Sequence, residues 1–437
     1  MSVREINGVE LSKLNLKKLL GFNGQIRFVD NIKSRKIKVG VVGVGYVGKA
    51  LAQALLSSGF KTYGFDINPD KLGEINHQKF TRAYNVEQLE NCDIVCICVP
   101  TPLDGKRQPD LRLLIKACNE LAALKTKKQL VIVESTVAPG TLRNIVSPIF
   151  AKEGKKLGED FYLAISPERV DPGNKVFTLK TTPKVVGGID EESAKLATEF
   201  YSTFIDEVVT TTTSEVAELS KLLENTFRLV NISLVNEIKG YADKAGIDIW
   251  EVINAAATKP FAFMPHYPGP GVGGHCIPVD PVYLLEEAKS KGVDLNITRS
   301  AIELNETMSK KIVGEAKRAL NGYTNGRKPK LLLIGLAYKP NSSDTRESPA
   351  LKIWKQAASE GFKVSYYDPH VPKLNGYTCQ PITKEILAKQ DVIVIVTHHE
   401  NIPYELLDEA GKPIIDTRNI MRKFSKDKFV WLERRVS

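Results

Sequence analysis

The stretch from Pro268 to Pro281 carries residue types that can do covalent chemistry. It reads Pro-Gly-Pro-Gly-Val-Gly-Gly-His-Cys-Ile-Pro-Val-Asp-Pro, so Cys276 follows a run of glycines and precedes Asp280 by four residues. The glycines let the backbone approach a bound ligand closely. A thiol there can attack a carbonyl if a nearby cation or helix N-terminus lowers its pKa from about 8.5. The alternative is a tight turn with a buried cysteine, because free cysteines are commonly buried.

Length and composition define the broad class of the protein. A chain of 437 residues is too long for one core, and about three domains are expected. We expect no membrane span and no secretion, because long apolar runs and a signal-peptide core are lacking. Six cysteines in so long a chain fit a reducing cytoplasm. The net charge of +10 is compatible with nucleic acid or with a phosphorylated substrate, although the lysines are scattered rather than gathered in one stripe.

The pattern from residue 37 onward is typical of a dinucleotide-binding turn. An apolar strand at residues 37–42 runs into glycines, an apolar helix follows at residues 50–56, and a second strand ends at Asp66. This is the full setting of the fingerprint. The turn reads Gly43-Val-Gly45-Tyr46-Val47-Gly48, and we expect these residues, the first valine apart, to contact the cofactor.

Each part of this fingerprint has a physical role. Gly43 makes the turn, Gly45 lets a pyrophosphate reach the backbone, and Gly48 lets helix and strand pack closely. The helix N-terminus faces the phosphates. Asp66 can accept hydrogen bonds from ribose hydroxyls and would repel a 2′-phosphate, so the sequence predicts NAD rather than NADP.

Polar residues follow three more apolar strands, at residues 94–99, 130–134 and 161–165. Ligands of such sheets bind at the carboxyl ends of the strands. A carboxylate after the third strand can act as a general base and an arginine beside it can bind an anion, whereas the alternative is a surface ion pair. The candidates are Thr101, Ser135, Thr136, Glu168 and Arg169. Three cysteines at positions 92, 96 and 98 do not indicate a metal site, because two of them lie inside the apolar strand.

From Ser214 the chain becomes helical, with Ser214 as the expected N-cap. Lys221 and Asn225 are four residues apart and project from one face of this helix. Together they can bind a substrate oxygen or a water; the alternative is two exposed polar residues. A further helix is expected at residues 297–320.

Residues 329–437 repeat the plan of the first domain without its glycine triplet. The turn after the first strand instead carries Lys339, Asp344, Arg346 and Glu347. Such a domain can hold a second nucleotide. Two nucleotide sites with a cysteine between them indicate NAD facing a nucleotide-activated substrate. Strands are expected at residues 331–334, 364–368, 392–397 and 414–417.

Motifs in one order along the chain resemble the nucleotide-sugar dehydrogenases, typified by UDP-glucose 6-dehydrogenase. The likeness runs from about residue 37 to the end and leaves out the basic residues 1–36. It rests on Gly43-Val-Gly-Tyr-Val-Gly48, Val99-Pro-Thr-Pro102, Glu134-Ser-Thr136, Ser166-Pro-Glu168, Glu218-Leu-Ser-Lys-Leu-Leu-Glu-Asn225, Gly273-Gly-His-Cys276 with Asp280, and Asp344-Thr-Arg-Glu-Ser348.

The resemblance implies a double oxidation of a primary alcohol to a carboxylate, with two NAD reduced. Cys276 matches the family nucleophile, which passes through a thiohemiacetal and a thioester, and Glu168 matches the base that acts on water. Lys221 would stabilise negative charge on oxygen, and Asn225 and Asp280 would hold the oxygen or the water. Arg346 is expected near the cofactor. The expected substrate-binding residues are Arg169, Lys221, Asn225, Arg228, Gly273, His275, Tyr338 and Lys339.

The resemblance also implies the substrate branch and the architecture. The forms Ser166-Pro-Glu-Arg169 and Gly274-His-Cys-Ile-Pro-Val-Asp280 look like the branch that oxidises UDP-N-acetyl-hexosamines, and more like the N-acetylglucosamine than the N-acetylmannosamine form. We expect an α/β chain of two Rossmann-like doubly wound domains joined by a central helical domain, assembled as a cytoplasmic homodimer. The expected parts are an extension at 1–36, an NAD-binding domain at 37–212, a helical domain at 213–320 and a UDP-sugar-binding domain at 321–437.

Two rival hypotheses make different predictions. A hydroxy-acid dehydrogenase can share the lysine–asparagine helix pair but needs no cysteine. A protein that only senses NAD or binds nucleic acid would show no turnover, and its affinity for polyanions would fall steeply with salt. The site motifs favour the enzyme, with no nucleic-acid, membrane or metal partner.

Overall fold

The computed structural model describes residues 27–126, 128–170, 176–320 and 326–424. The chain divides into two compact units, one ending at Leu222 and the other beginning at Leu223. Residues 27–33 are helical, and residues 1–26 of the predicted N-terminal extension fall outside the described residues. The four-part division predicted from the sequence stays a prediction.

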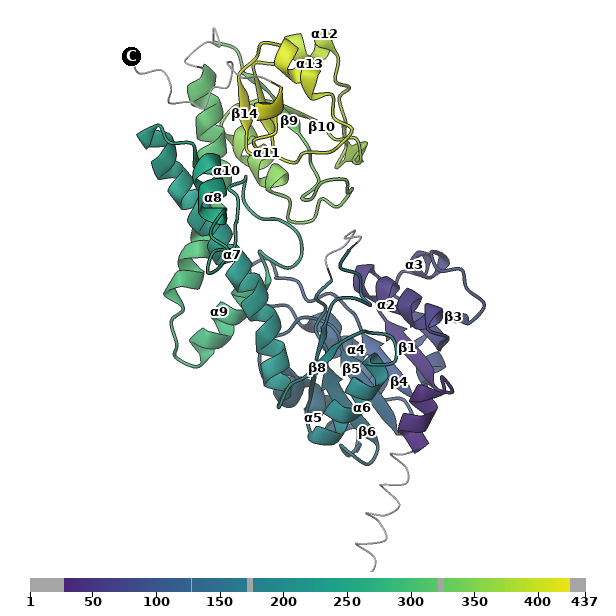
Figure 1. Ribbon diagram of the computed structural model, residues 1–437. Coiled ribbons are helices and arrows are strands. Elements are labelled where there is room, and N and C mark those ends of the chain that lie inside the picture. Colours follow the sequence, from purple (N-terminus) through teal and green to yellow (C-terminus); the bar gives the residue numbers. More distant parts are fainter. Residues whose placement is uncertain (1–26, 127, 171–175, 321–325, 425–437) are drawn as a thin grey trace, which may run out of the picture. The chain divides into compact units, whose positions relative to one another are not determined.

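The N-terminal unit is built on one eight-stranded sheet (Figure 1). Its order is β3-β2-β1-β4-β5-β6-β7-β8, and every neighbouring pair is parallel except β6 and β7. The chain changes direction across the sheet between β1 and β4, which is where such sheets bind ligands. The strands are Lys38–Val42 (β1), Lys61–Phe65 (β2), Phe80–Ala83 (β3), Ile94–Ile97 (β4), Gln129–Val133 (β5), Phe161–Ile165 (β6), Lys184–Gly188 (β7) and Val208–Thr210 (β8).

Helices cover both faces of this sheet because its central strands, such as β4, β5 and β6, are buried on both sides. Val39 and Val41 of β1 belong to the same core as Leu51 of α2. Val95 of β4 lies in the opposite core with Leu114 of α4. The helices are Tyr46–Ser57 (α2), Asp70–Gly73 (α3), Arg112–Ala122 (α4), Ser147–Lys152 (α5) and Glu191–Tyr201 (α6), with shorter turns at Val86–Leu89 (η1) and Leu142–Val146 (η2).

One long helix, α7 (Ser214–Ala245), passes from the first unit into the second. Its first turn corrects the predicted cap: the Val216 N–H donates to the Thr213 hydroxyl over 3.4 Å, while the Ser214 hydroxyl bonds the Glu215 carboxylate. Thr213 therefore supplies the capping oxygen. None of the described helices is long and apolar enough to span a membrane.

The C-terminal unit combines helices with a second parallel sheet in the order β10-β9-β13-β14. Its strands are Lys330–Ile334 (β9), Lys363–Tyr367 (β10), Val392–Ile395 (β13) and Ile414–Asp416 (β14), with a small hairpin of Lys373–Leu374 (β11) and Tyr377–Thr378 (β12). Its helices are Ile249–Ala257 (α8), Asp280–Ser290 (α9), Asn296–Leu320 (α10), Pro349–Ser359 (α11), Lys384–Ala388 (α12) and Tyr404–Glu409 (α13), followed by a turn at Met421–Lys423 (η3).

The turn after β9 repeats the geometry of the glycine turn after β1. Gly335 has φ +84° and donates to the Tyr367 carbonyl over 2.8 Å; Gly43 has φ +85° and donates to the Phe65 carbonyl over 2.8 Å. Both positions require the left-handed conformation that glycine tolerates. The structure confirms the predicted fold: two Rossmann-like doubly wound domains with helices between them in the chain.

Candidate active site

The glycine turn of the N-terminal unit leaves room for a ligand at one position. A Cβ on Gly48 would lie 2.0 Å from the Gly43 carbonyl oxygen, so this glycine lets α2 pack against the turn. A Cβ on Gly45 would meet no atom within 4 Å, and Gly45 directly precedes α2. Open space at a helix N-terminus is what a pyrophosphate needs. Tyr46 is exposed and Val47 half-buried at the same helix start.

Asp66 lies at the end of β2, facing the glycine turn. One carboxylate oxygen accepts from the Val44 N–H and the other from the Asn68 N–H, each over 2.8 Å. Each oxygen keeps a further lone pair with which it can accept from a hydroxyl. This end of the sheet therefore fits a nucleotide whose ribose bears free hydroxyls.

Three predicted cofactor residues lie together after β4 and β5. The Thr101 hydroxyl donates to the Thr136 carbonyl over 2.7 Å, and the Ser135 hydroxyl donates to the Val99 carbonyl over 2.6 Å. These bonds join the two loops at the carboxyl ends of neighbouring strands. They position the backbone of both loops where such sheets take up ligands.

The loop after β6 holds Glu168 firmly. One oxygen of its carboxylate accepts from the Arg169 N–H over 2.8 Å and from the Val170 N–H over 2.5 Å. The other oxygen lies 3.7 Å from the Lys184 ammonium, whose side chain is only 4% exposed. The ion pair of Glu168 is thus with a buried partner and not with a surface one. Arg169 donates one guanidinium N–H to the Pro183 carbonyl over 2.7 Å.

Lys221 and Asn225 are buried on α7, at 7% and 4% exposure, so they are not two exposed polar residues. The Asn225 amide donates to the Asp280 carboxylate over 2.5 Å. The Lys221 side chain makes no hydrogen bond or ion pair with any residue that the structure describes. A buried charge without a partner is costly, which points to an oxygen ligand for this ammonium. Arg228, one turn further, is exposed.

Cys276 is exposed, which rules out the buried-cysteine alternative. Its carbonyl accepts from the Asp280 N–H over 2.8 Å and from the Val279 N–H over 3.0 Å. This turn leads directly into α9, whose first residue, Asp280, is 3% exposed. The thiol therefore lies on the loop that directly precedes a helix, four residues before a buried carboxylate.

The cysteine loop packs against the loop that follows β9. A Cβ on Gly273 would lie 2.7 Å from the Glu347 carbonyl, and one on Gly274 would lie 2.8 Å from the Tyr338 ring. The Gly274 N–H donates to the Arg346 carbonyl over 3.1 Å. Glycine is needed at both positions so that the two loops can approach.

Charged side chains surround this contact. The Arg346 guanidinium pairs with the Asp344 carboxylate over 2.5 Å. Burial and the nearby Arg346 lower the pKa of His275 below its usual range, so this imidazole is neutral at pH 7. Of the predicted residues, Gly273, His275, Cys276, Tyr338 and Arg346 come together within the C-terminal unit.

Sequence reasoning missed Arg418, which follows β14. Burial lowers the pKa of its guanidinium to about 10, and its Nε donates to the Val396 carbonyl over 2.8 Å. A Cβ on Gly269, in the glycine-rich stretch, would lie 3.0 Å from the guanidinium. The signal was present, because Arg418 stands at the carboxyl end of a parallel strand in the second sheet.

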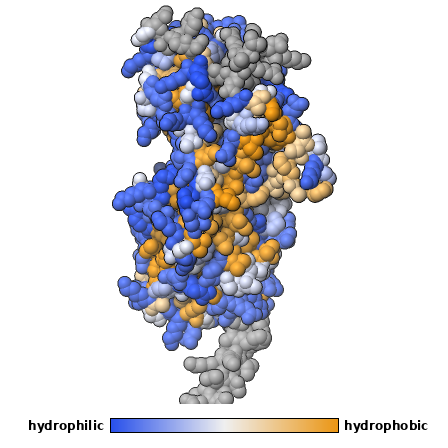
Figure 2. All heavy atoms as spheres, turned by 90° about the vertical axis from the view of Figure 1, so that its left-hand side faces the viewer, coloured by the Kyte–Doolittle hydropathy of each residue, from blue (hydrophilic) through white to orange (hydrophobic). Residues whose placement is uncertain are grey.

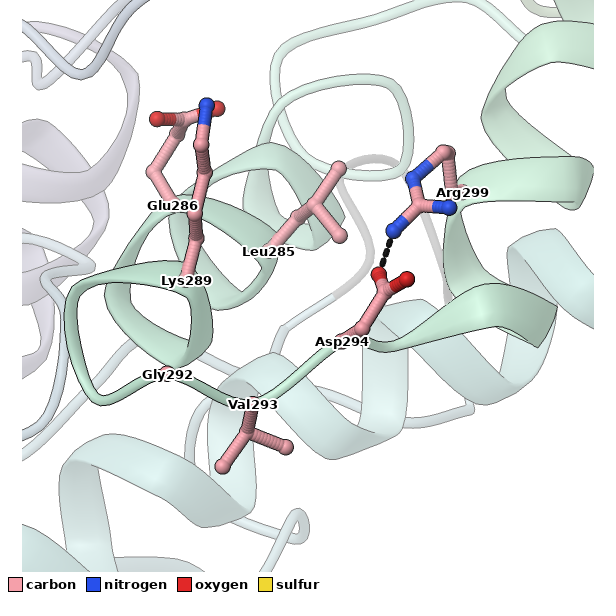
Figure 3. Close-up of a pocket in the computed structure, with 7 residues that line it drawn as sticks. All are labelled: Leu285, Glu286, Lys289, Gly292, Val293, Asp294 and Arg299. Carbon is pink, nitrogen blue, oxygen red and sulfur yellow. Dashed lines mark ion pairs between the residues drawn. The ribbon is translucent and has the colours of Figure 1, made fainter.

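A surface pocket of about 510 Å³ lies at the turn between α9 and α10 (Figure 3). Within it the Asp294 carboxylate pairs with the Arg299 guanidinium. None of the predicted site residues lines this pocket, so it is separate from the cysteine loop. It is lined by Leu285, Glu286, Lys289, Gly292, Val293, Asp294 and Arg299. In the described ranges no cluster of three or more His, Cys, Asp or Glu could hold a metal ion.

The fold and the glycine turn are typical of NAD-dependent dehydrogenases. Three domain models of the UDP-glucose/GDP-mannose dehydrogenase family match the chain: the NAD binding domain at residues 78–205, the central domain at 215–307 and the UDP binding domain at 332–423. Residues 23–127 also match the NAD binding domain of D-isomer specific 2-hydroxyacid dehydrogenases.

Relatives that align with most of the chain belong to the same class of enzyme. The chain is 35% identical over 420 residues to UDP-N-acetyl-D-mannosamine dehydrogenase of Methanocaldococcus jannaschii, covering 88% of this chain and 93% of the relative. It is 34% identical over 411 residues to UDP-N-acetyl-D-glucosamine 6-dehydrogenase of Pseudomonas aeruginosa, covering 86% and 95%. The structure of UDP-D-ManNAc dehydrogenase from Pyrococcus horikoshii superposes with a TM-score of 0.81 at 33% identity, covering 90% and 97%. The chain belongs to the UDP-glucose/GDP-mannose dehydrogenase family and is an NAD-dependent oxidoreductase.

Proposed function

We propose that this enzyme oxidises the C6 hydroxymethyl group of a UDP-N-acetyl-hexosamine to the carboxylate in two steps. The preferred substrate is UDP-N-acetylglucosamine and the product its uronate. The observation that carries the proposal is the exposed Cys276 thiol on a loop whose Asp280 is hydrogen-bonded to Asn225. A simple alcohol dehydrogenase does not need a nucleophilic thiol. An alcohol-to-acid dehydrogenase does, because an aldehyde must be held as an adduct that can lose hydride again.

The residues of this chain have distinct roles in the proposed reaction. NAD, when bound, accepts one hydride in each of the two oxidations. Lys221 stabilises the oxygen of the alcohol, the aldehyde and the thiohemiacetal as negative charge develops there. The Cys276 sulfur bonds to the aldehyde carbon while the π electron pair of the carbonyl moves to its oxygen, and loss of hydride from this carbon re-forms the carbonyl and leaves a thioester.

Hydrolysis then releases the acid. Glu168 accepts a proton from water while the water oxygen bonds to the thioester carbon, and the carbon–sulfur bond breaks with its electron pair returning to Cys276. Asn225 and Asp280 hold the reacting oxygen or the water. Further substrate contacts are assigned to Arg169, Arg228, Gly273, His275, Tyr338 and Lys339, with Arg346 assigned to the cofactor.

UDP-N-acetylmannosamine is the second candidate substrate, since the relative from Methanocaldococcus jannaschii carries that name. The choice of glucosamine rests on the form Cys276-Ile-Pro-Val-Asp280 and on the relative from Pseudomonas aeruginosa. An acetamido group needs a polar partner, for which Arg169 and His275 are the candidates. UDP-glucose, which lacks this group, ranks third.

We also propose that the enzyme is a cytoplasmic homodimer. All six cysteines are free thiols, as in a reducing compartment. Figure 2, which looks at the side on which α7 and α8 lie in Figure 1, shows apolar side chains gathered there. On α7 an apolar stripe repeats at spacings of three, four and seven residues, and a helix face of this kind fits a second copy of the same helix. The stripe comprises Val216, Leu219, Leu223, Phe227, Leu234, Ile238 and Tyr241, each exposed by more than 40%.

The test is to count NADH formed per sugar nucleotide consumed, with UDP-N-acetylglucosamine, UDP-N-acetylmannosamine and UDP-glucose supplied separately. Two NADH per UDP-N-acetylglucosamine, lost in Cys276→Ala, is the expected result. Preference for another sugar would keep the mechanism and change the substrate. One NADH per substrate with activity surviving in Cys276→Ala would refute the mechanism, and Cys118→Ala, a buried thiol in α4, is the control substitution.

A further inference from the structure

A buried cluster of charged residues lies behind Glu168 in the N-terminal unit. The Lys184 ammonium is 2.6 Å from one oxygen of Glu134, and the two side chains are 4% and 0% exposed. The same ammonium is 3.7 Å from Glu168 and donates to the Ser166 carbonyl over 3.3 Å. The Tyr201 hydroxyl donates to the other oxygen of Glu134. Buried charges are retained only when they are paired and hydrogen-bonded, and this cluster meets both conditions.

The one antiparallel pair of the sheet creates the cluster. Ala164 of β6 pairs with Gly188 of β7, and Ile165 pairs with Gly187. Continuing this register past the end of β6 brings residue 184 alongside residue 168. If β7 were parallel to β6, its first residue would lie beside the start of β6 rather than beside its end. The reversal of β7 therefore delivers Lys184 to the carboxyl end of β6, where Glu168 lies.

The loop that carries Glu168 is tied to the start of β7 at several points. The Ser166 hydroxyl donates to the Val185 carbonyl over 2.8 Å, and Arg169 donates to the Pro183 carbonyl over 2.7 Å. The Lys184 ammonium supplies the charged tie. It draws one oxygen of Glu168 toward the sheet while backbone N–H groups hold the other. The carboxylate is thus fixed from two sides.

Glu134 keeps the ammonium charged. Burial alone would lower the pKa of Lys184, but the adjacent carboxylates of Glu134 and Glu168 raise it above its ordinary value. Without Glu134, the lysine would face Glu168 as its only anionic partner in the cluster. Without Lys184, the Glu134 and Glu168 carboxylates would both lose the cation that lies 2.6 Å from one and 3.7 Å from the other.

We propose that Lys184, supported by Glu134 and Tyr201, is a positioning residue that orients the Glu168 carboxylate for its reaction with water. This inference rests on the proposed function, because it takes Glu168 as the base of thioester hydrolysis. Lys184 touches neither reacting atom and acts through Glu168. Loss of Lys184 therefore slows hydrolysis and spares the two oxidations that precede it.

The prediction separates the steps of one catalytic cycle. In Lys184→Met, the first turnover still releases two NADH per subunit in a burst, and the steady rate that follows falls about 10- to 100-fold, the scale of a misplaced catalytic group. The acyl intermediate accumulates, and mass spectrometry of the quenched protein finds the sugar-nucleotide adduct on Cys276. Lys184→Arg, which retains the cation, recovers part of the steady rate.

A charge-matched double variant separates positioning from folding. Lys184→Met leaves the Glu134 carboxylate buried without its cation, which destabilises the unit. Lys184→Met with Glu134→Gln removes both charges, so its melting temperature returns toward the wild type while the burst and the adduct persist. A stable double variant with the wild-type steady rate would overturn the inference alone.

Failure of the proposed function gives a different result. Wild-type protein without Cys276-dependent NADH formation would overturn the function and, with it, the role of Lys184. A Lys184→Met variant that is slow from the first NADH onward, with no adduct on Cys276, would leave the function intact and overturn the inference. Lys180→Met serves as the control, since this lysine is exposed and pairs with Asp206 at 3.8 Å.

Discussion

The Asn225 amide of α7 donates to the carboxylate of Asp280, the first residue of α9, across 2.5 Å. Both side chains are nearly inaccessible to water. The bond ties a residue of the long helix to the end of the cysteine loop, because the Asp280 N–H also donates to the Cys276 carbonyl. A substitution at Asn225 should therefore change the position of the Cys276 thiol.

We expect Asn225→Ala to lower the free energy of unfolding by about 1–3 kcal/mol, the cost of leaving a buried acceptor without its donor. Turnover should fall by about 10-fold or more because the loop of Cys276 loses its tie to α7. Urea unfolding and steady-state NADH formation measure the two effects. Asn231→Ala on the same helix, where the amide bonds the Phe227 carbonyl at the surface, should change stability by less than about 0.5 kcal/mol.

Much of the fold could be predicted from the spacing of apolar residues and from the polar or glycine residues that end each element. The strand expected at residues 130–134 is β5 at Gln129–Val133, and the helix expected at residues 297–320 is α10 at Asn296–Leu320. The local sequence determines such elements. A strand appears as an apolar run of strand length that ends at polar or glycine residues, and a helix appears as apolar residues spaced three or four apart. The sequence predicted no strand at Lys184–Gly188, and its antiparallel direction depends on which neighbour it pairs with.

The part of the site that could be predicted is the glycine turn, where the spacing of the motif determines the backbone geometry. A Cβ on Gly43 or Gly48 would collide with a carbonyl oxygen, so both positions need glycine. The spacing of the glycines in the sequence is enough to predict this. Lys184 was missed because nothing local distinguishes a buried cation from the other lysines and arginines of a basic chain. Its burial is a product of tertiary pairing, which a single sequence does not display.

Glu218 makes the stability of the enzyme depend on pH. Its carboxylate accepts from the Gly140 N–H over 2.6 Å and the Leu142 N–H over 2.9 Å, and burial raises its pKa from 4.5 to about 7. The folded state thus binds this proton more tightly than the unfolded state. The resulting stabilisation is complete below pH 4.5 and is lost as the pH rises through about 7.

We therefore expect the wild type to lose about 1–3 kcal/mol relative to Glu218→Gln between pH 5 and pH 8. Glu215→Gln is the control on the same helix. Arg143 lowers the pKa of Glu215 to about 2, so its contribution is constant above pH 4.5 and is lost only as the pH falls through 2. Thermal melts of the three proteins across this range measure the effect. Parallel curves for the wild type and Glu218→Gln would contradict the prediction.

Gly45→Ala separates the binding of NAD from folding. The protein itself leaves the space of this Cβ open, so the variant should fold with a change of less than about 1 kcal/mol. A pyrophosphate that approaches the backbone here would meet the new methyl group. We expect the affinity for NAD to fall by about 10-fold or more, as measured by calorimetry without substrate. Gly73→Ala, at a second glycine with no atom within 4 Å, should leave the affinity unchanged.

The apolar stripe of α7 should decide the oligomeric state. Leu223 is 61% exposed and Ile238 is 41% exposed, and burying such side chains against a second copy is worth about 1.5–3 kcal/mol each. A carboxylate placed in that contact would have to be desolvated without a partner. We expect the double variant Leu223→Glu with Ile238→Glu to sediment as a monomer of 48.4 kDa while the wild type sediments at twice that mass. Leu113→Glu, at a residue of α4 that is 39% exposed, should leave the dimer intact. A wild type that sediments as a monomer would refute the dimer.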